Sequence, residues 1–221
     1  PQPTLHDLQI EVAATPAEVA GSRYRTLNAA LAYLAAQAAQ NPKITFTEAG
    51  NYDIASSGAT AYAGGKGYTT ITATAPITFR KVSQQTGSAN LWRPGTDGLW
   101  FRGSNITFDF KWVNHIYHEN AANRAHVFDG VRCIDSGGRY YTYLLSTKPT
   151  PYIARNAPWL LECDISTIPN PGNNARLVRG CTISGGSSDV MTQAECAVGN
   201  TIHGFSSDEW RAETPALTVQ Y

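Results

Sequence analysis

The sequence predicts an all-β fold in which short parallel strands coil into a β-solenoid. One observation is an internal repeat near the C-terminus. Residues 178–189 (VRGCTISGGSSD) and 198–208 (VGNTIHGFSSD) both run from a short β-branched strand, through a glycine, to a Ser-Ser-Asp turn. Such a unit, repeated about every 20 residues, is typical of one solenoid coil. The other observation is composition: only 15% of the residues are charged and 19 are glycine, which suits many tight turns.

Length and charge narrow the classes of function. The chain has 221 residues, enough for a substantial core, and its 17 basic and 17 acidic side chains cancel. Because no net charge attracts polyanions, we expect neither nucleic acid nor a membrane as a partner. No apolar run reaches the roughly 18 residues that span a bilayer. The first residues, PQPTLH, lack the basic and apolar regions of a signal peptide, and we expect an extracellular or virion protein without one in this chain.

Residues 1–21 are predicted to form an N-terminal arm. They contain three prolines and only one alternating segment, LQIEV at 8–12, which suits an edge strand. One amphipathic helix is expected next, over about residues 22–40. Ser22 is a suitable N-cap, apolar residues recur at helical spacing, and Asn41-Pro42 ends the pattern. This helix is predicted to cap the open end of the solenoid.

Residues 43–221 are predicted to form the coils, in a domain that spans residues 22–221 with the helix. From Lys43 the pattern changes to period two, with strands expected at 44–47, 70–74 and 77–80. Later strands are aligned on apolar pairs: Phe101 and Ile106, Phe128 and Ile134, Leu161 and Ile165, Val178 and Ile183, and Val198 and Ile202. Segments 112–125 and 139–158 are interpreted as insertions that protrude between coils.

The chain stops at residues 217–221 (LTVQY), a strand-like segment with no cap after it. We therefore expect either a truncated solenoid or an end that another chain caps. The cysteines lie in or beside short apolar strands, without a CxxC pair or zinc spacing. Buried thiols stacked in an interior column are the favoured interpretation, and disulfides between neighbouring coils are the alternative.

The helix, the segment ITFTEAGNY at 44–52 and the repeated Val-x-Gly-x-x-Ile units together resemble the pectin-lyase-like superfamily. The resemblance covers roughly residues 22–210 and implies a right-handed parallel β-helix with an N-terminal capping helix. It also implies a protein that acts on or grips a long glycan along the helix side, as the polysaccharide lyases, glycoside hydrolases, epimerases and phage tailspikes of this superfamily do. The signatures of polygalacturonases and pectate lyases are missing, so no enzyme family is assigned.

The first candidate for chemistry is a group of carboxylates in the two repeated turns. If the coils stack, Asp189 and Asp208 lie about 5 Å apart, with Glu209 adjacent and His203 in the second coil. Two carboxylates at that distance suit the acid and the nucleophile of a retaining glycosidase. The same oxygens, with serine hydroxyls, suit Ca²⁺. A solvated turn used twice is the third interpretation, and no metal ligands are assigned.

The second candidate is the segment after the strand that begins at Ile106. A lyase acting on uronic acids needs a cation to neutralise the carboxylate and a base to take the C5 proton. One short loop supplies these types of side chain: Lys111, His115, Tyr117, His118 and Arg124. A polar surface loop with incidental histidines is the alternative.

The third candidate is an aromatic and basic segment in the second insertion. Tyrosine rings stack on sugar rings, and arginine donates hydrogen bonds to hydroxyls or acidic groups. The residues of this type are Tyr140, Tyr141, Tyr143 and Arg155. Alternatively, the rings pack the insertion against the coil or contact another subunit.

Two hypotheses of function follow. The first is a carbohydrate-active β-helix that binds, and in one version cleaves, a polysaccharide along its side. The second is a structural virion or surface protein, a spike or decoration module that forms a homotrimer or contacts other virion proteins without catalysis. Oligomeric state separates them, because secreted lyases of this fold are usually monomers and spikes are usually trimers.

Overall fold

Short strands dominate the structure of this chain. The computed structural model describes residues 9–37, 40–53, 67–80, 90–91, 98–111, 115–118, 126–137, 145–147, 159–168, 175, 177–185 and 196–204. In these residues one helix occurs, α1 (Leu27–Ala35), and the remaining regular structure is β-strand. The chain is therefore all-β, as predicted.

Two long parallel sheets pack against each other and extend along the molecule. The nine-stranded sheet has the spatial order β18 (Cys196–Val198), β16 (Leu177–Arg179), β14 (Trp159–Leu161), β11 (Val127–Asp129), β8 (Leu99–Arg102), β5 (Thr69–Ala73), β3 (Lys43–Phe46), β1 (Gln9–Val12) and β2 (Arg23–Tyr24). The seven-stranded sheet has the order β19 (Thr201–His203), β17 (Thr182–Ser184), β15 (Asp164–Ser166), β12 (Arg132–Ile134), β9 (Ile106–Asp109), β6 (Ile77–Arg80) and β4 (Gly50–Asp53).

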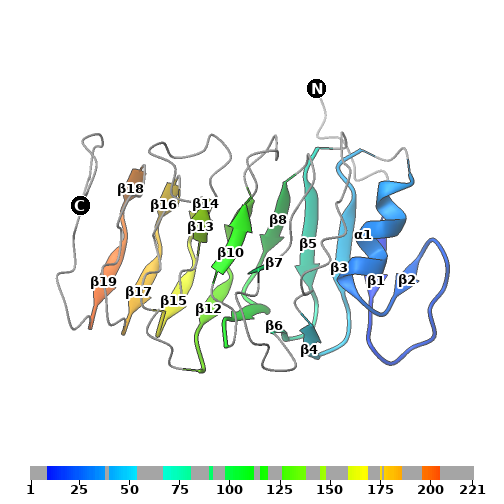
Figure 1. Cartoon of the computed structure of the whole chain (residues 1–221), viewed down its shortest axis with the longest axis horizontal. Coiled ribbons are helices and arrows are strands. Elements are labelled where there is room, and N and C mark those ends of the chain that lie inside the picture. The colour runs from blue at the N-terminus through cyan, green and yellow to red at the C-terminus, as the bar shows by residue number, and fades with distance from the viewer. Residues whose placement is uncertain are drawn as a thin grey trace.

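The connectivity of these sheets is that of a solenoid. From β3 onward the chain moves from a strand of the nine-stranded sheet to one of the seven-stranded sheet, so each passage adds one strand to both. The strand pairings within the sheets are parallel. Figure 1 shows the strands following one another along the long axis, from β1 and β2 to β18 and β19. This arrangement is compatible with a parallel β-helix.

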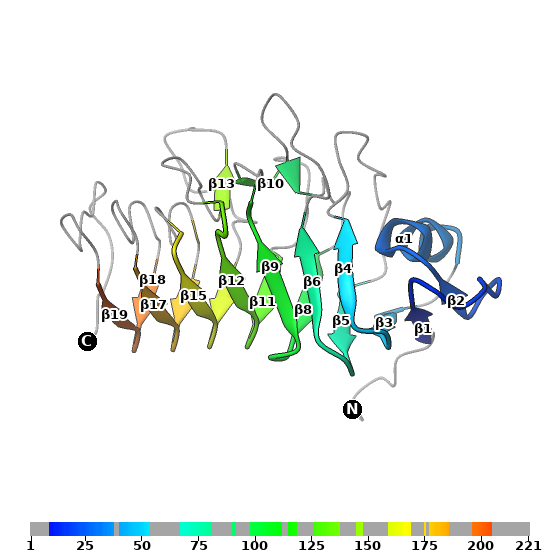
Figure 2. The same cartoon turned by 90° about the horizontal axis from the view of Figure 1, so that it is seen from below.

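The two segments interpreted as protruding insertions each contain a strand. A three-stranded parallel sheet has the order β13 (Leu145–Thr147), β10 (His115–His118) and β7 (Asn90–Leu91). β10 belongs to segment 112–125 and β13 to segment 139–158, and both lie on one side of the molecule (Figure 2). Strands of three or four residues inside long insertions carry too little periodicity to be recognised from one sequence.

The strand expected at the edge of the sheet in the N-terminal segment is an inner strand. β1 pairs with β3 on one side and with β2 on the other, so it lies inside the sheet. Glu11 N donates to Ser22 O at 2.8 Å. Because residues 23–24 are held in β2, the helix begins at Leu27 instead of after Ser22. Its N-cap is Thr26, whose Oγ1 accepts a hydrogen bond from Ala29 N at 3.1 Å.

Helix α1 packs at the N-terminal end of the sheets. It lies beside β1 and β2 (Figure 2). Its buried side chains, which belong to the same core as those of the first strands, are Leu27, Ala30, Leu31 and Leu34. The apolar face predicted from helical spacing is therefore confirmed, while a capping function stays a prediction.

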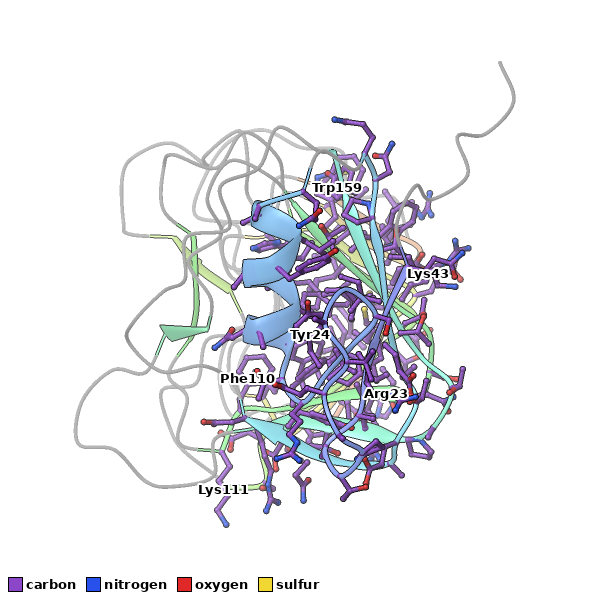
Figure 3. The ribbon with its side chains drawn as sticks, turned by 90° about the vertical axis from the view of Figure 1, so that its right-hand side faces the viewer. Arg23, Tyr24, Lys43, Phe110, Lys111 and Trp159 are labelled. Atoms are coloured by element: carbon purple, nitrogen blue, oxygen red, sulfur yellow. The ribbon has the colours of Figure 1, made fainter. Side chains whose placement is uncertain are left out.

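The core between the sheets consists of columns of side chains at matching register. The central column of the nine-stranded sheet is Ile10, Ile44, Ile71, Phe101, Phe128, Leu160, Val178 and Ala197. Each is at most 6% exposed. The facing column is Tyr52, Phe79, Phe108, Cys133, Ile165, Ile183 and Ile202. Figure 3, seen from the N-terminal end, shows side chains filling this space.

The register corrects part of the predicted alignment. Ile165, Ile183 and Ile202 stack as expected, but Val178 pairs with Ala197, not with Val198. Likewise Leu160, not Leu161, is the inward residue of its strand, and Cys133, not Ile134, is the inward residue of β12. Ile106 is buried as expected, but Phe108 of the same strand is the residue in register with Cys133. A slip of one residue reverses the face of every side chain. Where two adjacent residues are both apolar, the sequence pattern does not decide which one points inward.

The corners between the two sheets are tight turns with one residue in the left-handed region. Gly130, Gly180 and Gly199 hold this position with φ of 64°, 64° and 61°. Glu162 holds it between β14 and β15 with φ of 52°. A side chain in this region costs roughly 1–2 kcal/mol, whereas glycine adopts it without steric conflict. Glu162 is therefore a strained residue in an otherwise glycine position.

We expect Glu162→Gly to raise the free energy of unfolding by about 0.5–1 kcal/mol, because relief of strain exceeds the entropic cost of glycine. Urea denaturation measures the change. Glu162→Ala is the matched control, since it removes the carboxylate but keeps a Cβ in the strained conformation. Equal stability of the two variants would contradict the strain explanation.

Candidate functional site

The predicted carboxylate group is only partly covered by the structure. Asp189, Asp208 and Glu209 lie outside the described residues. His203 is the last residue of β19, is exposed, and pairs in Cα register with Ser184 at the end of β17. The strands that precede the two Ser-Ser-Asp turns are thus in-register neighbours, and the proximity of the two aspartates stays a prediction.

The predicted lyase loop is in part a strand. Lys111 follows β9 and is half-buried, and Figure 3 shows it directed away from the packed interior. His115, Tyr117 and His118 belong to β10, where Tyr117 pairs with Ser146 and His118 with Thr147. The structure therefore places these three residues on one strand of the third sheet. Outside the described residues lie Arg124, Tyr140, Tyr141, Tyr143 and Arg155.

Two buried carboxylates occur at the ends of β9 and β12, where the chain leaves the seven-stranded sheet. Asp109 is 4% exposed and Asp135 is 3% exposed. Asp109 Oδ1 accepts hydrogen bonds from Lys111 N and Ser136 N, both at 3.0 Å, and Oδ2 accepts from Ser136 Oγ at 2.7 Å. Asp135 Oδ1 accepts from Gly137 N at 2.8 Å. We call Asp109, Lys111, Asp135 and Ser136 the Asp109 cluster.

The Asp109 cluster links three neighbouring coils. Thr167, after β15, accepts a hydrogen bond at Oγ1 from Asp135 N at 3.1 Å and has φ of 62°, unusual for a β-branched residue. A carboxylate whose oxygens accept from backbone N–H groups fixes the course of the chain. The cluster therefore determines how the chain leaves β9 towards Lys111 and β10, and it acts as a support for that region.

An aromatic group with charged neighbours lies on the outer face of the nine-stranded sheet. Leu99 and Phe101 point into the core, so Trp100 and Arg102 point outward. Trp100 Nε1 donates to Asp129 Oδ2 at 3.1 Å, and Arg102 Nε lies 3.4 Å from the same oxygen. The Arg102 guanidinium is 5.4 Å from the centre of the indole ring.

Tyr68 completes this group, which we call the Trp100 cluster (Tyr68, Trp100, Arg102 and Asp129). Its ring meets Trp100 edge to face at a centroid distance of 6.1 Å. The Arg102 side chain is 61% exposed, whereas the carboxylate of Asp129 is shielded at 21%. The shielded carboxylate orients the indole through its N–H, so the cluster presents a fixed aromatic ring beside an accessible cation.

The outer face around Trp100 changes character along the molecule. At the register of Trp100 the neighbouring strands carry Thr70 on one side and Val127, Trp159 and Leu177 on the other. Trp100 and Trp159 are thus separated by one strand, about 9–10 Å at the backbone. In this row the outward side chains are polar near β3 and β5 and become apolar towards β16. The Trp100 cluster lies at the boundary between the polar and the apolar part.

The Trp100 cluster was not among the predicted site residues, although a signal for it exists. In the sequence LWFR at 99–102, inward Leu99 and Phe101 require an outward tryptophan and arginine. Asp129 is in register with Arg102, but that neighbour is known only once the coils are aligned. The sequence carries no comparable signal that Asp109 is buried, because its hydrogen-bond partner Ser136 is distant in the sequence.

Two classes of site can be checked against the described residues. No group of three or more His, Cys, Asp or Glu side chains in these ranges is arranged to hold a metal ion. The Ca²⁺ hypothesis depends on Asp189 and Asp208 and is not tested there. Among the same residues, no helix is both long and apolar enough to cross a bilayer.

Comparison with known proteins provides no relative from which residues could be transferred. No family model matches the chain, and neither a curated protein nor a solved structure matches it. The assignment of a site therefore depends on the geometry of the Trp100 cluster and the Asp109 cluster.

Proposed function

We propose that this chain is a pectin-lyase-like, right-handed parallel β-helix, capped by α1, that binds a polysaccharide along its side in an extracellular or virion setting. The observation that carries the proposal is the Trp100 cluster. Arg102 lies over the half-buried indole, so the remaining apolar surface of the ring and the exposed guanidinium together offer the two contacts that sugars use, an apolar surface and a donor of hydrogen bonds. The long parallel sheets supply a regular surface on which successive sugar units can lie.

The geometry favours binding over cleavage at this cluster. Asp129 already accepts from Trp100 and pairs with Arg102, so its role is to hold the ring. The oxygens of Asp109 likewise accept hydrogen bonds from the chain itself. Cleavage, where it occurs, is proposed for the predicted groups in the C-terminal turns (Asp189, Asp208, Glu209 and His203) or around β10 (Lys111, His115, Tyr117, His118 and Arg124).

A second function, a trimeric structural spike, is favoured by one observation. On the last coils the outward positions of the nine-stranded sheet include three half-buried apolar side chains, Leu161, Leu177 and Val198, with the exposed Arg179 between Leu161 and Val198. A face of this kind suits contact with another subunit. Sedimentation of the purified chain tests it, because a trimer supports the spike and a monomer supports the secreted glycan-binding protein.

Trp100→Ala is expected to weaken binding of the recognised polysaccharide at least tenfold, which corresponds to about 1.4 kcal/mol. The assay is a panel of acidic and neutral polysaccharides, in which the bound fraction, reducing ends and absorbance near roughly 235 nm for unsaturated products are followed. The matched control is Thr107→Ala, an outward position on the seven-stranded sheet. Equal affinity of Trp100→Ala and the unchanged chain would refute the site, and no binding to any polysaccharide would refute the function.

A further inference from the structure

Two cysteines occupy the same position in successive corner turns. Cys163 follows Glu162 and Cys181 follows Gly180, each between a strand of the nine-stranded sheet and one of the seven-stranded sheet. The next residues, Asp164 and Thr182, are Cα partners in register, and Thr182 N donates to Cys163 O at 2.9 Å. The two cysteines therefore lie on adjacent coils.

The thiols themselves are buried and close. Each cysteine is 1% exposed, and both thiols are free. Cys163 Sγ lies 3.3 Å from Leu161 O and Cys181 Sγ lies 3.5 Å from Arg179 O, equivalent carbonyls of the two turns. The side chains thus leave the same turn in the same way, and Cys163 Sγ also lies 3.3 Å from Phe128 O of the preceding coil.

The spacing of the two turns suits a disulfide. Backbones of paired strands are about 4.8 Å apart, which falls within the separation of roughly 4.4–6.8 Å between bridged Cα atoms. The other thiols do not share the position. Cys133 lies on β12 in register with Ile165, and Cys196 begins β18, paired with Leu177. The predicted interior column of cysteines is therefore limited to Cys163 and Cys181 within the described residues.

We propose that Cys163 and Cys181 form a disulfide that links the β14–β15 coil to the β16–β17 coil when the chain folds in the presence of a small-molecule disulfide. One thiolate attacks a sulfur of the oxidant and releases its first thiol. The second thiolate attacks the resulting mixed disulfide and releases the other thiol. Two protein thiols are oxidised, the oxidant is reduced to two thiolates, and the two protons lost by the protein thiols are taken up by these thiolates to give two thiols.

Because both thiols are buried, exchange proceeds while the coils are still forming and is slow in the folded chain. Either thiol can make the first attack at that stage, because the pair is not yet packed.

The experiment is refolding of the full chain in reduced and oxidised glutathione, followed by alkylation and peptide mass mapping. We expect one pair of the four thiols to be lost and a cross-linked fragment joining 163 to 181. Because the bond closes a loop of about 20 residues, the melting temperature should rise by roughly 5–10 °C. Retention of all four thiols, or a bond to Cys133 or Cys196 instead, would overturn the proposal.

Matched variants separate the bond from general effects of oxidation. Val131 follows Gly130 at the same position of the preceding turn, so Cys163→Val and Cys181→Val place a side chain that this position accepts. Either variant should lose the cross-link and the rise in melting temperature. Cys196→Ser should keep both. A cross-linked and stabilised Cys163→Val chain would show that another pair is responsible.

Discussion

Replacing Phe108 with alanine is expected to lower the free energy of unfolding by about 3–5 kcal/mol, the largest effect of any single change considered. Phe108 is fully buried, and its ring lies between both sheets. Its centroid is 5.2 Å from Phe79, 5.0 Å from Phe101, 5.2 Å from Phe128 and 6.4 Å from Phe110. Four rings therefore lose a partner at once, and backbone hydrogen bonds on both sides keep the cavity from closing.

Urea denaturation of the full chain measures this loss. Phe108→Leu is the matched variant, because it keeps most of the apolar volume and should cost less than Phe108→Ala. Val19→Ala, at an exposed position, is the control for a change that removes apolar volume from the surface and should stay within about 0.5 kcal/mol. A loss below about 1 kcal/mol for Phe108→Ala would contradict the central place of this ring in the core.

The sequence predicts an apolar core between stacked strands, but it predicts only part of the register between neighbouring strands. The repeated units brought Ile183 and Ile202 into one column, and the structure has them paired. The repeat also predicts that Val198 aligns with Val178, whereas Ala197 is the inward residue. A small inward residue next to a larger outward one reverses the pattern that hydrophobicity alone gives. Only the backbone pairing of neighbouring coils determines which of the two faces the core.

The helix and the third sheet show two further limits. Arg23 and Tyr24 are drawn into β2 by pairing with Glu11 and Val12, so a tertiary contact, not the local pattern, determines where α1 can begin. Similarly, β10 is stabilised by β7 and β13, which come from distant parts of the chain. Pairing at long range decides these elements, and one sequence without relatives contains no direct record of it.

The candidate site, too, could be predicted only in part from the sequence. Trp100 and Arg102 are recognisable as outward residues once Leu99 and Phe101 are assigned to the core. That Asp129 holds both of them is a consequence of stacking β8 against β11. In the sequence, the polar residues that suggest chemistry gather in turns and insertions. The Trp100 cluster instead lies on a sheet face, where Trp100 stands between polar Thr70 and apolar Val127 in its row.

The second large effect is expected at Asp109, where alanine should cost about 2–4 kcal/mol because three donors lose their acceptor. Lys111 N and Ser136 N both donate to Oδ1, and Ser136 Oγ donates to Oδ2. Asp109→Asn keeps the oxygen that accepts from the two backbone groups, and the Ser136 hydroxyl, which is exposed, can accept from the new amide. Asparagine should therefore cost only about 1 kcal/mol.

Urea denaturation and hydrogen exchange at Lys111 and Ser136 test this difference together. In Asp109→Ala both amides should exchange faster, while in Asp109→Asn they should stay protected. If asparagine were as destabilising as alanine, the negative charge of Asp109, and not its hydrogen bonds, would be what the fold requires. The chain passes from this cluster towards β10. Loss of protection in Asp109→Ala that extends to the amides of His115–His118 would therefore show that the Asp109 cluster also supports the predicted lyase residues.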